Sequence, residues 1–417
     1  MIQGKNIVCL GFPAWEGDYM KAIVQLLSVL ARRNRVLYVE YQYTYKDVVV
    51  GLAGKKNIPV KRITGFKPRL RSISLKDQQT KVNVLTVPAI YPVNWLPDGK
   101  TYQFFLRRNA NTIKKAIQRA VASLDMHNPI VINAFNPAYG APLVGELHEK
   151  LLLYYCYDEI SHAKWCKKHG ATMEARFAAQ VDAIVTTSEQ LQISKKAYNE
   201  QCFLVKNGVN LSLFEQALAQ KKMLQKSQQT ATNSNFVVGY LGTIDDRLDY
   251  PLLALCILQA PNVTFQFVGR ITFPEGQEQL EKYPNVQFLG AQPPEKLADF
   301  VAKFDLGVIP FVSNGFTKSI YPLKINEYLA AGLPVITTNF GKLGDFTEVA
   351  TIVETPEAFL EAILYQQKQL PDAPATIQAQ KHRLAFAQSN SWEHRAEELS
   401  QIIEKIIDHK KTAFQTP

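Results

Sequence analysis

The stretch from Phe304 to Thr338 constrains the fold more than any other, because a strand, a helix and a second strand follow one another within it. Leu306 to Phe311 is a short apolar run, typical of a strand that is buried on both faces of a sheet. Pro322 suits the first position of a helix, and Gly332 suits the residue that ends it. Pro334 then opens a further apolar run. The stretch therefore predicts a strand–helix–strand unit with parallel strands.

The helix predicted within this unit carries two opposite charges on one face. Lys324 and Glu327 lie three residues apart, which fits an ordinary surface ion pair. The helix also follows the carboxyl end of a buried parallel strand, where open α/β sheets bind ligands, and its amino terminus suits a phosphate group. This position favours a nucleotide-sugar pocket, in which Lys324 contacts phosphate and Glu327 accepts hydrogen bonds from sugar hydroxyls.

The same segment resembles the nucleotide-binding unit of GT-B glycosyltransferases, especially the retaining family 4 group. In these enzymes a Glu is followed by A-x-A/S-x-G-x-P-V-I. The pattern is filled here by Glu327, Gly332, Pro334 and Val335. Many members carry a second Glu eight residues earlier, where this chain has Ser319. A subgroup is marked by Pro-x-Lys before the helix, as from Pro322 to Lys324 here.

The resemblance implies an α/β protein of GT-B architecture, with two Rossmann-like domains facing each other across a cleft. It also implies transfer of a sugar from a nucleotide diphosphate donor with retention of configuration, without an essential metal or other cofactor. The expected donor-binding residues are Gly242, Thr243, Gly269, Ser319, Tyr321, Pro322, Leu323 and Glu327. Family 4 members often have Arg in place of Thr243. Arg247 and Lys324 are therefore expected to stabilise the leaving diphosphate, unless Arg247 forms a surface salt bridge with Asp245 or Asp246 instead.

Strands and helices also alternate in the first half of the chain, which predicts a second parallel sheet. Residues in the loops after its strands are expected to contact the acceptor, namely Gly11, Trp15, Gly17, Asn136 and His162. Asp158 follows the apolar run Leu151–Tyr157 and has two interpretations. It acts in catalysis, on an acceptor hydroxyl or the donor sugar, or it caps the next helix. Related transferases often have a short acidic motif here, as in Asp158 and Glu159.

The length of 417 residues allows two domains with separate cores. We expect an N-terminal acceptor-binding domain over 1–210 and a C-terminal nucleotide-sugar-binding domain over 236–390. Residues 211–235 are predicted to be a partly helical linker. Residues 391–417 are predicted to form a helix that crosses back to the N-terminal domain, followed by a tail. Asn207 and Gly208 fit a tight turn with positive φ at the end of the first domain.

Charge is distributed unevenly along the chain. Residues 1–207 hold 29 Lys or Arg against 15 Asp or Glu, whereas the remainder holds 18 against 22. The stretch from Lys55 to Arg71 contains no acidic residue and lies within an insertion, predicted between residues 44 and 79, that is either a long loop or loosely helical. It fits either a solvated basic loop or contact with an anionic membrane surface or a phosphorylated lipid acceptor. No nucleic-acid-binding motif is present, so nucleic acid is not expected as a partner.

The scattered cysteines, the lack of a signal peptide and the lack of a long apolar run predict a cytoplasmic protein, with a peripheral position on the inner face of the plasma membrane as an option. His162, Cys166 and His169 imitate a metal site but lack a fourth ligand, so no metal is expected. The predicted acceptor is a glycan or lipid-linked intermediate of polysaccharide biosynthesis. Three alternatives stay open: an NDP-sugar epimerase of the same fold, a non-catalytic membrane-associated protein, and an inverting transferase.

Overall fold

The computed structural model describes residues 1–17, 21–75, 77, 79–162, 168–228, 235–371 and 373–413. These residues form two compact units. The first consists of Met1–Glu16, Lys21–Lys206 and the chain from Arg395 onward; the second consists of Asn207–His394, with which Gly17 is grouped. Each unit is built on a largely parallel β-sheet, so the α/β class predicted from the sequence is confirmed.

The sheet of the first unit has the strand order β3-β4-β2-β1-β5-β6-β7-β8. Its strands are β1 (Asn6–Leu10), β2 (Arg35–Val39), β3 (Leu70–Ser74), β4 (Lys81–Leu85), β5 (Ile130–Ala134), β6 (Leu151–Cys156), β7 (Ala183–Thr186) and β8 (Cys202–Leu204). Neighbouring strands are parallel, except that β3 runs antiparallel to β4. Because β1 pairs with β2 on one side and β5 on the other, the strand order reverses between β1 and β5.

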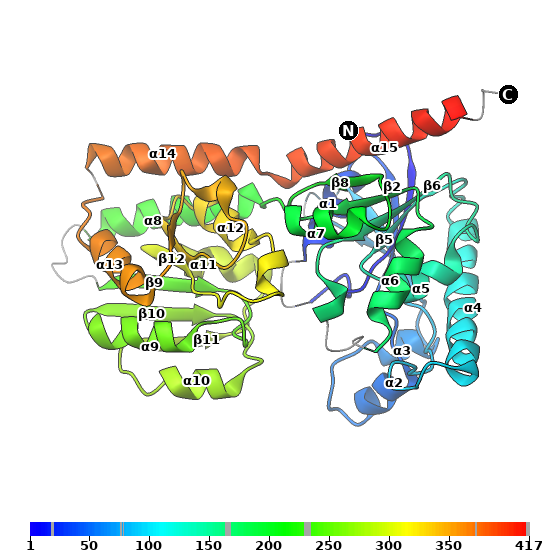
Figure 1. The fold of residues 1–417 in the computed structure, drawn as a ribbon, viewed down its shortest axis with the longest axis horizontal. Helices are drawn as coiled ribbons and strands as arrows, with labels where there is room; N and C mark the ends of the chain where they lie inside the picture. Colours follow the sequence, from blue (N-terminus) through cyan, green and yellow to red (C-terminus); the bar gives the residue numbers. More distant parts are fainter. Residues whose placement is uncertain are drawn as a thin grey trace. The chain divides into compact units, whose positions relative to one another are not determined.

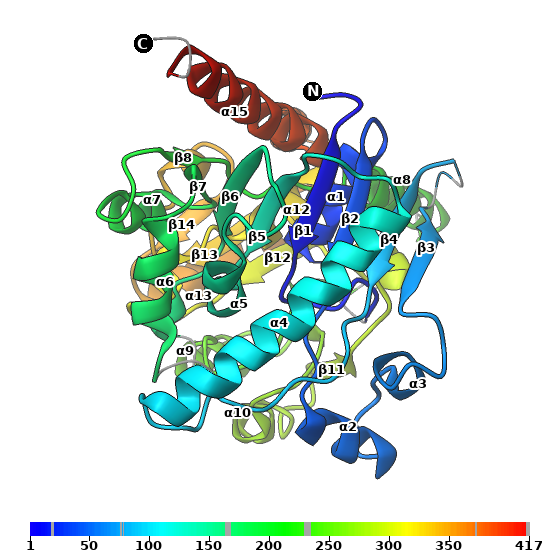
Figure 2. The same cartoon turned by 90° about the vertical axis from the view of Figure 1, so that its right-hand side faces the viewer.

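Helices cover this sheet and complete its core. They are α1 (Ala22–Ala31), α2 (Tyr45–Leu52), α3 (Val60–Ile63), α4 (Lys100–Ser123), α5 (Pro137–Gly140), α6 (Gly170–Ala178) and α7 (Glu189–Lys196), with the short 3-10 helices η1 (Ala141–Leu143) and η2 (Ile160–His162). Figure 2 shows α4 crossing one face of the sheet. Ile113 and Ile117 of this helix are buried in one core cluster with Val8, Leu37 and Leu152 of the strands.

The sheet of the second unit has the order β11-β10-β9-β12-β13-β14, and its neighbouring strands are parallel. Its strands are β9 (Phe236–Leu241), β10 (Val263–Val268), β11 (Val286–Gly290), β12 (Leu306–Ile309), β13 (Val335–Thr338) and β14 (Thr351–Val353). The predicted strand–helix–strand unit is confirmed as β12, α12 and β13.

Helices lie on both faces of the second sheet. They are α8 (Leu211–Gln228), α9 (Tyr250–Gln259), α10 (Pro274–Leu280), α11 (Leu297–Val301), α12 (Leu323–Ala330), α13 (Pro356–Gln367) and α14 (Pro374–Ser389), with η4 (Pro294–Lys296), η5 (Thr317–Ser319) and η6 (Gly344–Phe346). Figure 1 shows the sheet between α8, α12 and α14 on one side and α9 and α10 on the other. The unit is thus a three-layer α/β sandwich.

Side chains cap the first turns of two helices. The Ser188 side chain accepts a hydrogen bond from the amide of Leu191 (3.2 Å) at the start of α7. The Asp249 carboxylate accepts one from the amide of Leu252 (3.0 Å) at the start of α9. Asp18, expected to cap the first helix, lies outside the described residues.

The insertion between residues 44 and 79, predicted to be a long loop or loosely helical, contains the helices α2 and α3 and one strand that was not predicted. Thr44 and Asp47 cap α2 reciprocally, because each side chain accepts a hydrogen bond from the main-chain amide of the other. Leu70–Ser74 forms the edge strand β3. The sequence does not reveal this strand because an edge strand buries little, and none of its residues is fully buried.

Of the stretch 211–235, predicted to be a partly helical linker, residues 211–228 form a helix that belongs to the second unit, and residues 229–234 lie outside the described residues. Leu211–Gln228 forms helix α8, which packs on α11 and α12, and Lys221 Nζ lies 2.8 Å from Asp305 Oδ1. Among the described residues with positive φ, neither Asn207 nor Gly208 appears. A Cβ atom on Gly208 would lie 2.8 Å from the main-chain nitrogen of Trp392, so close packing, not positive φ, requires glycine there.

Helix α15 (Trp392–Ala413) starts in the second unit, and its residues from Arg395 onward belong to the first. Within the first unit, the Lys410 ammonium lies 2.6 Å from the Asp182 carboxylate. The amino group of Met1 forms a salt bridge with Glu397 of the same helix. Across the described ranges, none of the helices has both the length and the apolar composition needed to span a membrane.

Candidate functional site

A pocket of about 390 Å³ lies at the carboxyl edge of the second sheet. The strand order reverses between β9 and β12, because β9 pairs with β10 on one side and with β12 on the other. In open α/β sheets ligands bind at such a reversal. The pocket is lined by Leu241, Gly242, Thr243, Val268, Gly269, Arg270, Thr272, Ala291, Gln292, Leu297, Leu323, Lys324 and Glu327.

The amino-terminal turn of α12 forms one wall of this pocket. Pro322 is the N-cap residue and not, as predicted, the first residue of the helix, which begins at Leu323. In the described part of the chain, no side chain caps the amides of this turn. The helix is held in place by Tyr328, whose hydroxyl accepts a hydrogen bond from the amide of Leu241 (2.7 Å). The Tyr328 ring packs on Gly307, where a Cβ atom would come within 2.5 Å of it. Uncapped amides at a helix start suit an anionic group.

Lys324 lies against the loop that follows β9. A Cβ atom on Gly242 would come within 2.2 Å of Lys324 Cε, so the glycine leaves room for the lysine. The Nζ atom lies 5.5 Å from the ring centroid of Tyr240 and 5.5 Å from that of Phe311. These distances are within cation–π range. The ammonium is therefore positioned by glycine and two aromatic rings.

Glu327 lines the same pocket and is only 8% exposed. Burial lowers the pKa of Lys324, and the nearby Arg247 lowers it further. Burial raises the pKa of Glu327, and the attraction between the two charges partly counteracts both shifts. Over the described ranges, neither charged group has a hydrogen-bond or salt-bridge partner. Buried charges without partners are unfavourable in an empty site, so both groups are available to a ligand.

Three of the predicted donor-binding residues, Ser319, Tyr321 and Pro322, are not among the described residues that line the pocket. The Ser319 hydroxyl donates a hydrogen bond to the carbonyl of Phe316 (2.7 Å), and this residue is buried in η5. The ring of Tyr321 packs on Phe346, with 5.4 Å between the ring centroids. These contacts hold the loop before α12, so Ser319 and Tyr321 support the pocket and do not line it.

Arg247 forms a two-pronged ion pair with Asp245. Its Nε lies 2.9 Å from Oδ1, and its Nη2 lies 2.6 Å from Oδ2. The guanidinium carbon is 5.2 Å from the ring centroid of Phe311, which Lys324 also approaches. The salt bridge given as the alternative role of Arg247 is thus present, and Arg247 is absent from the described lining residues. It acts on the pocket through its charge beside Lys324.

Arg270 is a candidate binding residue that sequence reasoning missed, and it lines the pocket directly after Gly269. The amide of Ile244 donates to the carbonyl of Arg270 (2.8 Å), and the amide of Thr272 donates to the carbonyl of Ile244 (2.9 Å). These bonds join the loops after β9 and β10 and fix Arg270 on the pocket wall. The sequence did contain a signal for it, because Arg270 immediately follows a strand-terminal glycine. Family 4 members often have an Arg in the corresponding position after Gly242, where this chain has Thr243.

In the first unit, Gly11 and Asn136 lie beside the strand-order reversal between β1 and β5. Gln42 connects them: its Nε2 donates to the Gly11 carbonyl (3.2 Å), and its Oε1 accepts from Nδ2 of Asn136 (2.5 Å). A Cβ atom on Gly11 would come within 2.2 Å of the Tyr38 hydroxyl, so only glycine fits there. Two predicted acceptor-binding residues are thus brought together, and Gln42 is a third polar group that the sequence did not reveal.

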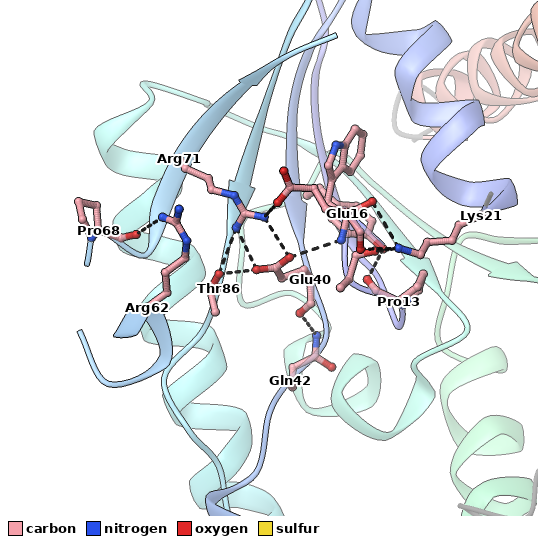
Figure 3. Close-up of polar contacts among 12 residues, drawn as sticks. Pro13, Glu16, Lys21, Glu40, Gln42, Arg62, Pro68, Arg71 and Thr86 are labelled. Atoms are coloured by element: carbon pink, nitrogen blue, oxygen red, sulfur yellow. Dashed lines mark hydrogen bonds and ion pairs between the residues drawn. The ribbon is translucent and has the colours of Figure 1, made fainter. Parts of the chain in front are cut away.

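Trp15 is attached to the same sheet edge by a charged cluster of Glu40, Arg71, Glu16 and Thr86, which Figure 3 shows. Its amide donates to Glu40 Oε2 (3.4 Å), and Arg71 Nη1 lies 3.0 Å from Glu40 Oε1. Arg71 also reaches Glu16 Oε2 (2.9 Å), and the Thr86 hydroxyl donates to Glu40. The Trp15 side chain is buried, so its contacts are with the protein. The cluster holds the loop after β1 onto the neighbouring strands.

Asp158 lies on the loop between β6 and η2, next to a buried ion cluster. Lys195 Nζ lies 2.9 Å from Glu159 Oε1 and 2.8 Å from Glu174 Oε2. The Tyr154 hydroxyl donates to Glu174 (2.7 Å). The cluster fixes the main chain beside Asp158 at the carboxyl end of β6. A catalytic role for Asp158 stays a prediction.

The remaining predicted site residues are not joined to this edge. Gly17 is exposed and grouped with the second unit. The side chain of His162 and the whole of Cys166 lie outside the described residues. Of the residues that the structure describes, no group of three or more His, Cys, Asp or Glu is placed to hold a metal ion. The expectation that no metal takes part stays a prediction.

Comparison with known proteins shows which fold this chain shares and which family part of its second unit resembles. Residues 235–367 match the family model described as Glycosyl transferases group 1. The sucrose-phosphate synthase of Thermosynechococcus elongatus has a TM-score of 0.69 at 16% identity, covering 97% of this chain and 100% of that chain. HepE of Anabaena, solved in complex with UDP-glucose, has a TM-score of 0.63 at 14% identity, covering 96% and 99%. The chain therefore has the GT-B fold, and residues 235–367 of its second unit are similar to group 1 glycosyl transferases.

A curated relative is similar over part of the chain. The "Putative teichuronic acid biosynthesis glycosyltransferase TuaH" of Bacillus subtilis (strain 168) is 31% identical over 220 residues, which cover 48% of this chain and 53% of TuaH. The match thus spans about half the length of that relative.

Proposed function

We propose that this protein transfers a sugar from a nucleotide diphosphate donor, bound in the pocket of the second unit, to an acceptor hydroxyl. The observation that carries the proposal is the pair Lys324 and Glu327. Both line one pocket, and in the described part of the chain the charged group of neither side chain has a hydrogen-bond or salt-bridge partner. A nucleotide sugar complements both charges, because it has an anionic diphosphate and hydroxyls that donate hydrogen bonds. The match of residues 235–367 to group 1 glycosyl transferases supports the same function.

In the proposed donor complex, the diphosphate lies at the amino terminus of α12. The uncapped amides of this turn and the Lys324 ammonium both favour an anion. Arg270 adds a second cation on the pocket wall. Glu327 accepts hydrogen bonds from the ribose hydroxyls, as the family 4 resemblance implies. HepE has been solved with UDP-glucose, which makes UDP-sugars the first donors to test.

The proposed chemistry follows from the charge that develops during transfer. As the bond between the anomeric carbon and the diphosphate breaks, negative charge collects on the diphosphate and the sugar gains oxocarbenium character. The acceptor oxygen forms the new bond to the anomeric carbon, and its proton passes to the departing diphosphate. Fixed positive groups at the leaving diphosphate stabilise this state, and one such contact contributes about 10²–10³-fold in rate. We assign this role to Lys324, and assign Asp158 to the acceptor hydroxyl, with retention of configuration.

The proposed acceptor is a glycan or lipid-linked intermediate of polysaccharide biosynthesis, used at the cytoplasmic face of the membrane. TuaH, whose name refers to teichuronic acid biosynthesis, supports this class of product. In the first unit, Gly11, Gln42 and Asn136 place polar groups at the sheet edge where an acceptor would bind. The excess of Lys and Arg in residues 1–207 favours an anionic partner on this unit.

The proposal is tested by binding first and by product analysis second. Isothermal titration of the full chain with UDP, GDP and their sugars identifies the donor. The bound donor is then incubated with and without bacterial lipid extracts, and products are analysed by mass spectrometry and NMR. Glu327→Ala is expected to weaken nucleotide binding, and Lys324→Ala to slow transfer more than it weakens binding. The exposed Lys318 provides the control variant Lys318→Ala, which should leave both unchanged.

Each alternative function has its own outcome in this experiment. Release of an altered nucleotide sugar without acceptor would identify an epimerase. Absence of nucleotide binding would identify a non-catalytic protein and would contradict the proposal. A product with inverted anomeric configuration would keep the transferase and overturn retention. Wild-type binding and transfer by both site variants would remove the assignment of Lys324 and Glu327.

A further inference from the structure

An apolar stripe on α2 faces solvent in the first unit. Tyr45, Val49 and Leu52 lie at positions i, i+4 and i+7 and therefore share one face of the helix. Their exposed fractions are 50%, 66% and 71%. Of the helix residues, Val48 is buried on the protein side. A helix of a soluble protein normally turns its apolar stripe toward the core, so α2 carries its stripe in the opposite orientation.

Aromatic contacts extend this stripe from α2 to α4. The ring centroids of Tyr45 and Tyr91 are 5.1 Å apart, those of Tyr91 and Phe105 are 4.9 Å apart, and those of Phe105 and Phe104 are 5.3 Å apart. Figures 1 and 2 both place α2, α3 and the amino-terminal end of α4 at the same end of the first unit. The exposed apolar residues of these segments are here called the α2–α4 apolar surface: Tyr45, Val49, Leu52, Phe66, Trp95 and Phe104.

The segment that carries most of this surface is strongly cationic. Residues 44–71 contain eight Lys or Arg and one acidic residue, Asp47, which already pairs with Lys56 (2.9 Å). Four further lysines are exposed, and in the described part of the chain their ammonium groups have no hydrogen-bond or salt-bridge partner: Lys46, Lys55, Lys61 and Lys67. Arg71 is different, because it is bound to Glu40 and Glu16. The positive charges that are not engaged in ion pairs therefore belong to these four lysines, which flank the apolar residues.

We propose that the α2–α4 apolar surface docks on an anionic lipid bilayer. Exposed apolar and aromatic side chains suit the boundary between headgroups and acyl chains, and flanking lysines suit anionic headgroups. A second copy of this chain is a poorer occupant, because two patches with the same positive charge would repel each other. The contiguous aromatic chain and the charge together favour a bilayer over a soluble partner.

This inference deepens the proposed function, and its consequence for the acceptor rests on that function. Ring contacts also run from Tyr43, two residues before α2, toward the loop after β1. The centroids of Tyr43 and Tyr41 are 5.0 Å apart, and those of Tyr41 and Phe12 are 5.5 Å apart. Phe12 directly follows Gly11, one of the predicted acceptor-binding residues. A bilayer held at α2 would therefore lie next to a continuous aromatic path toward the acceptor loop.

The test is co-sedimentation of the full chain with vesicles of phosphatidylcholine alone or mixed with phosphatidylglycerol. Wild type is expected to sediment with the mixed vesicles and to be released by salt. Val49→Glu/Leu52→Glu should reduce binding at least about tenfold, because two apolar side chains are lost from the interface. Lys55→Gln/Lys61→Gln should reduce it about fivefold per lysine. The control is Leu258→Glu, a helix residue of the second unit that is 65% exposed, which should bind as wild type.

Thermal unfolding and UDP-sugar affinity are measured for each variant and should not change. Equal vesicle binding by wild type and both double variants would overturn the inference. A wild type that ignores vesicles but forms a dimer, which Val49→Glu/Leu52→Glu converts to a monomer, would assign the surface to self-association and also overturn it. If vesicle binding fails while donor binding and transfer to a soluble acceptor persist, the proposed function stands. If vesicle binding succeeds without donor binding, only the proposed function fails.

Discussion

The Arg71 guanidinium lies 3.0 Å from the Glu40 carboxylate, and this contact ties the edge strand β3 to the end of the buried strand β2. Glu40 is 2% exposed and also accepts hydrogen bonds from Thr86 and the amide of Trp15. Burial alone would lower the pKa of Arg71, but its hydrogen bonds and attraction to Glu40 raise it overall. The pair is therefore a structural element of the first unit, and it removes one cation from the basic run that begins at Lys55.

Glu40→Ala is expected to destabilise the first unit strongly. The substitution leaves the largely buried Arg71 without its carboxylate, and loss of one partner of a buried pair costs about 3–5 kcal/mol. Glu16→Ala is the matched control, because Glu16 contacts the same guanidinium with a side chain that is 71% exposed. That change should cost less than about 1 kcal/mol. Urea unfolding of both variants checks the difference, and equal losses would contradict a buried pair.

Neutralising both charges of the donor pocket is expected to raise stability while abolishing nucleotide binding. Burial shifts the pKa of Lys324 downward and that of Glu327 upward, so each shift disfavours the charged form in the folded state. At neutral pH, Lys324→Met/Glu327→Gln should therefore stabilise the empty protein by about 1–2 kcal/mol. The control is Lys318→Met/Glu361→Gln, which neutralises two exposed charges. It should change neither the stability nor the nucleotide affinity. A destabilised double variant would show that the two charges stabilise the fold.

The affinity for UDP-glucose is expected to decline on both sides of neutral pH. As the pH rises, Lys324 loses its proton below the ordinary lysine range, because its pKa is lowered by burial. As the pH falls, Glu327 gains a proton above the ordinary carboxylate range, because its pKa is raised by burial. UDP-glucose is the right probe, since UDP has a terminal phosphate that itself titrates near about pH 6. Titration calorimetry should show that Lys324→Met removes the alkaline decline and Glu327→Gln the acidic one.

The sequence was sufficient for features that depend on local pattern. The apolar runs, Pro322 and Gly332 define β12, α12 and β13, and the spacing of Lys324 and Glu327 places both on the helix that lines the pocket. These predictions succeed because a helix or a buried strand imposes its own period on the residues that form it.

Features that depend on contacts between distant segments could not be read in this way. Gln42 reaches Asn136 only because the strand order places the ends of β2, β1 and β5 side by side. Arg270 enters the pocket because the loops after β9 and β10 bond to each other. Gly208 is required by the approach of Trp392, which is remote in sequence. Each of these contacts follows from the sheet topology, which local periodicity does not specify.

Lys195→Met is expected to be far more damaging than Lys196→Met, although the two residues are neighbours. Lys195 is 2% exposed and holds Glu159 and Glu174, whereas Lys196 is exposed. Burial alone would raise the pKa of Glu159, but hydrogen bonds from Lys195 lower it overall, so this carboxylate stabilises the fold above its unfolded pKa and loses that contribution in acid. At neutral pH, Lys195→Met should cost about 3–5 kcal/mol, and Lys196→Met less than about 0.5 kcal/mol.

Unfolding of both variants by urea over a range of pH checks this expectation. Because Lys195 also fixes the main chain next to Asp158, its loss should reduce transfer more than it reduces nucleotide affinity, which belongs to the second unit. Parallel losses of transfer and of nucleotide affinity would instead indicate general unfolding. Wild-type stability of Lys195→Met would show that the buried cluster contributes nothing.

Gly269→Ala is expected to damage the donor pocket, while Gly290→Ala in the same sheet is expected to be mild. A Cβ atom on Gly269 would lie 1.8 Å from the main-chain oxygen of Gly242, so the loops after β9 and β10 would have to separate. We expect a loss of about 2–4 kcal/mol in stability and at least tenfold weaker UDP-glucose binding, because both loops line the pocket. Gly290 has φ of 68° but nothing within 4 Å of its Cβ position, so alanine there costs only the local strain of about 1–2 kcal/mol. Calorimetric titration and thermal unfolding of the two variants distinguish the effect of the contact between the loops from the effect of backbone strain. Equal effects of the two variants on UDP-glucose affinity would contradict the role of the joined loops.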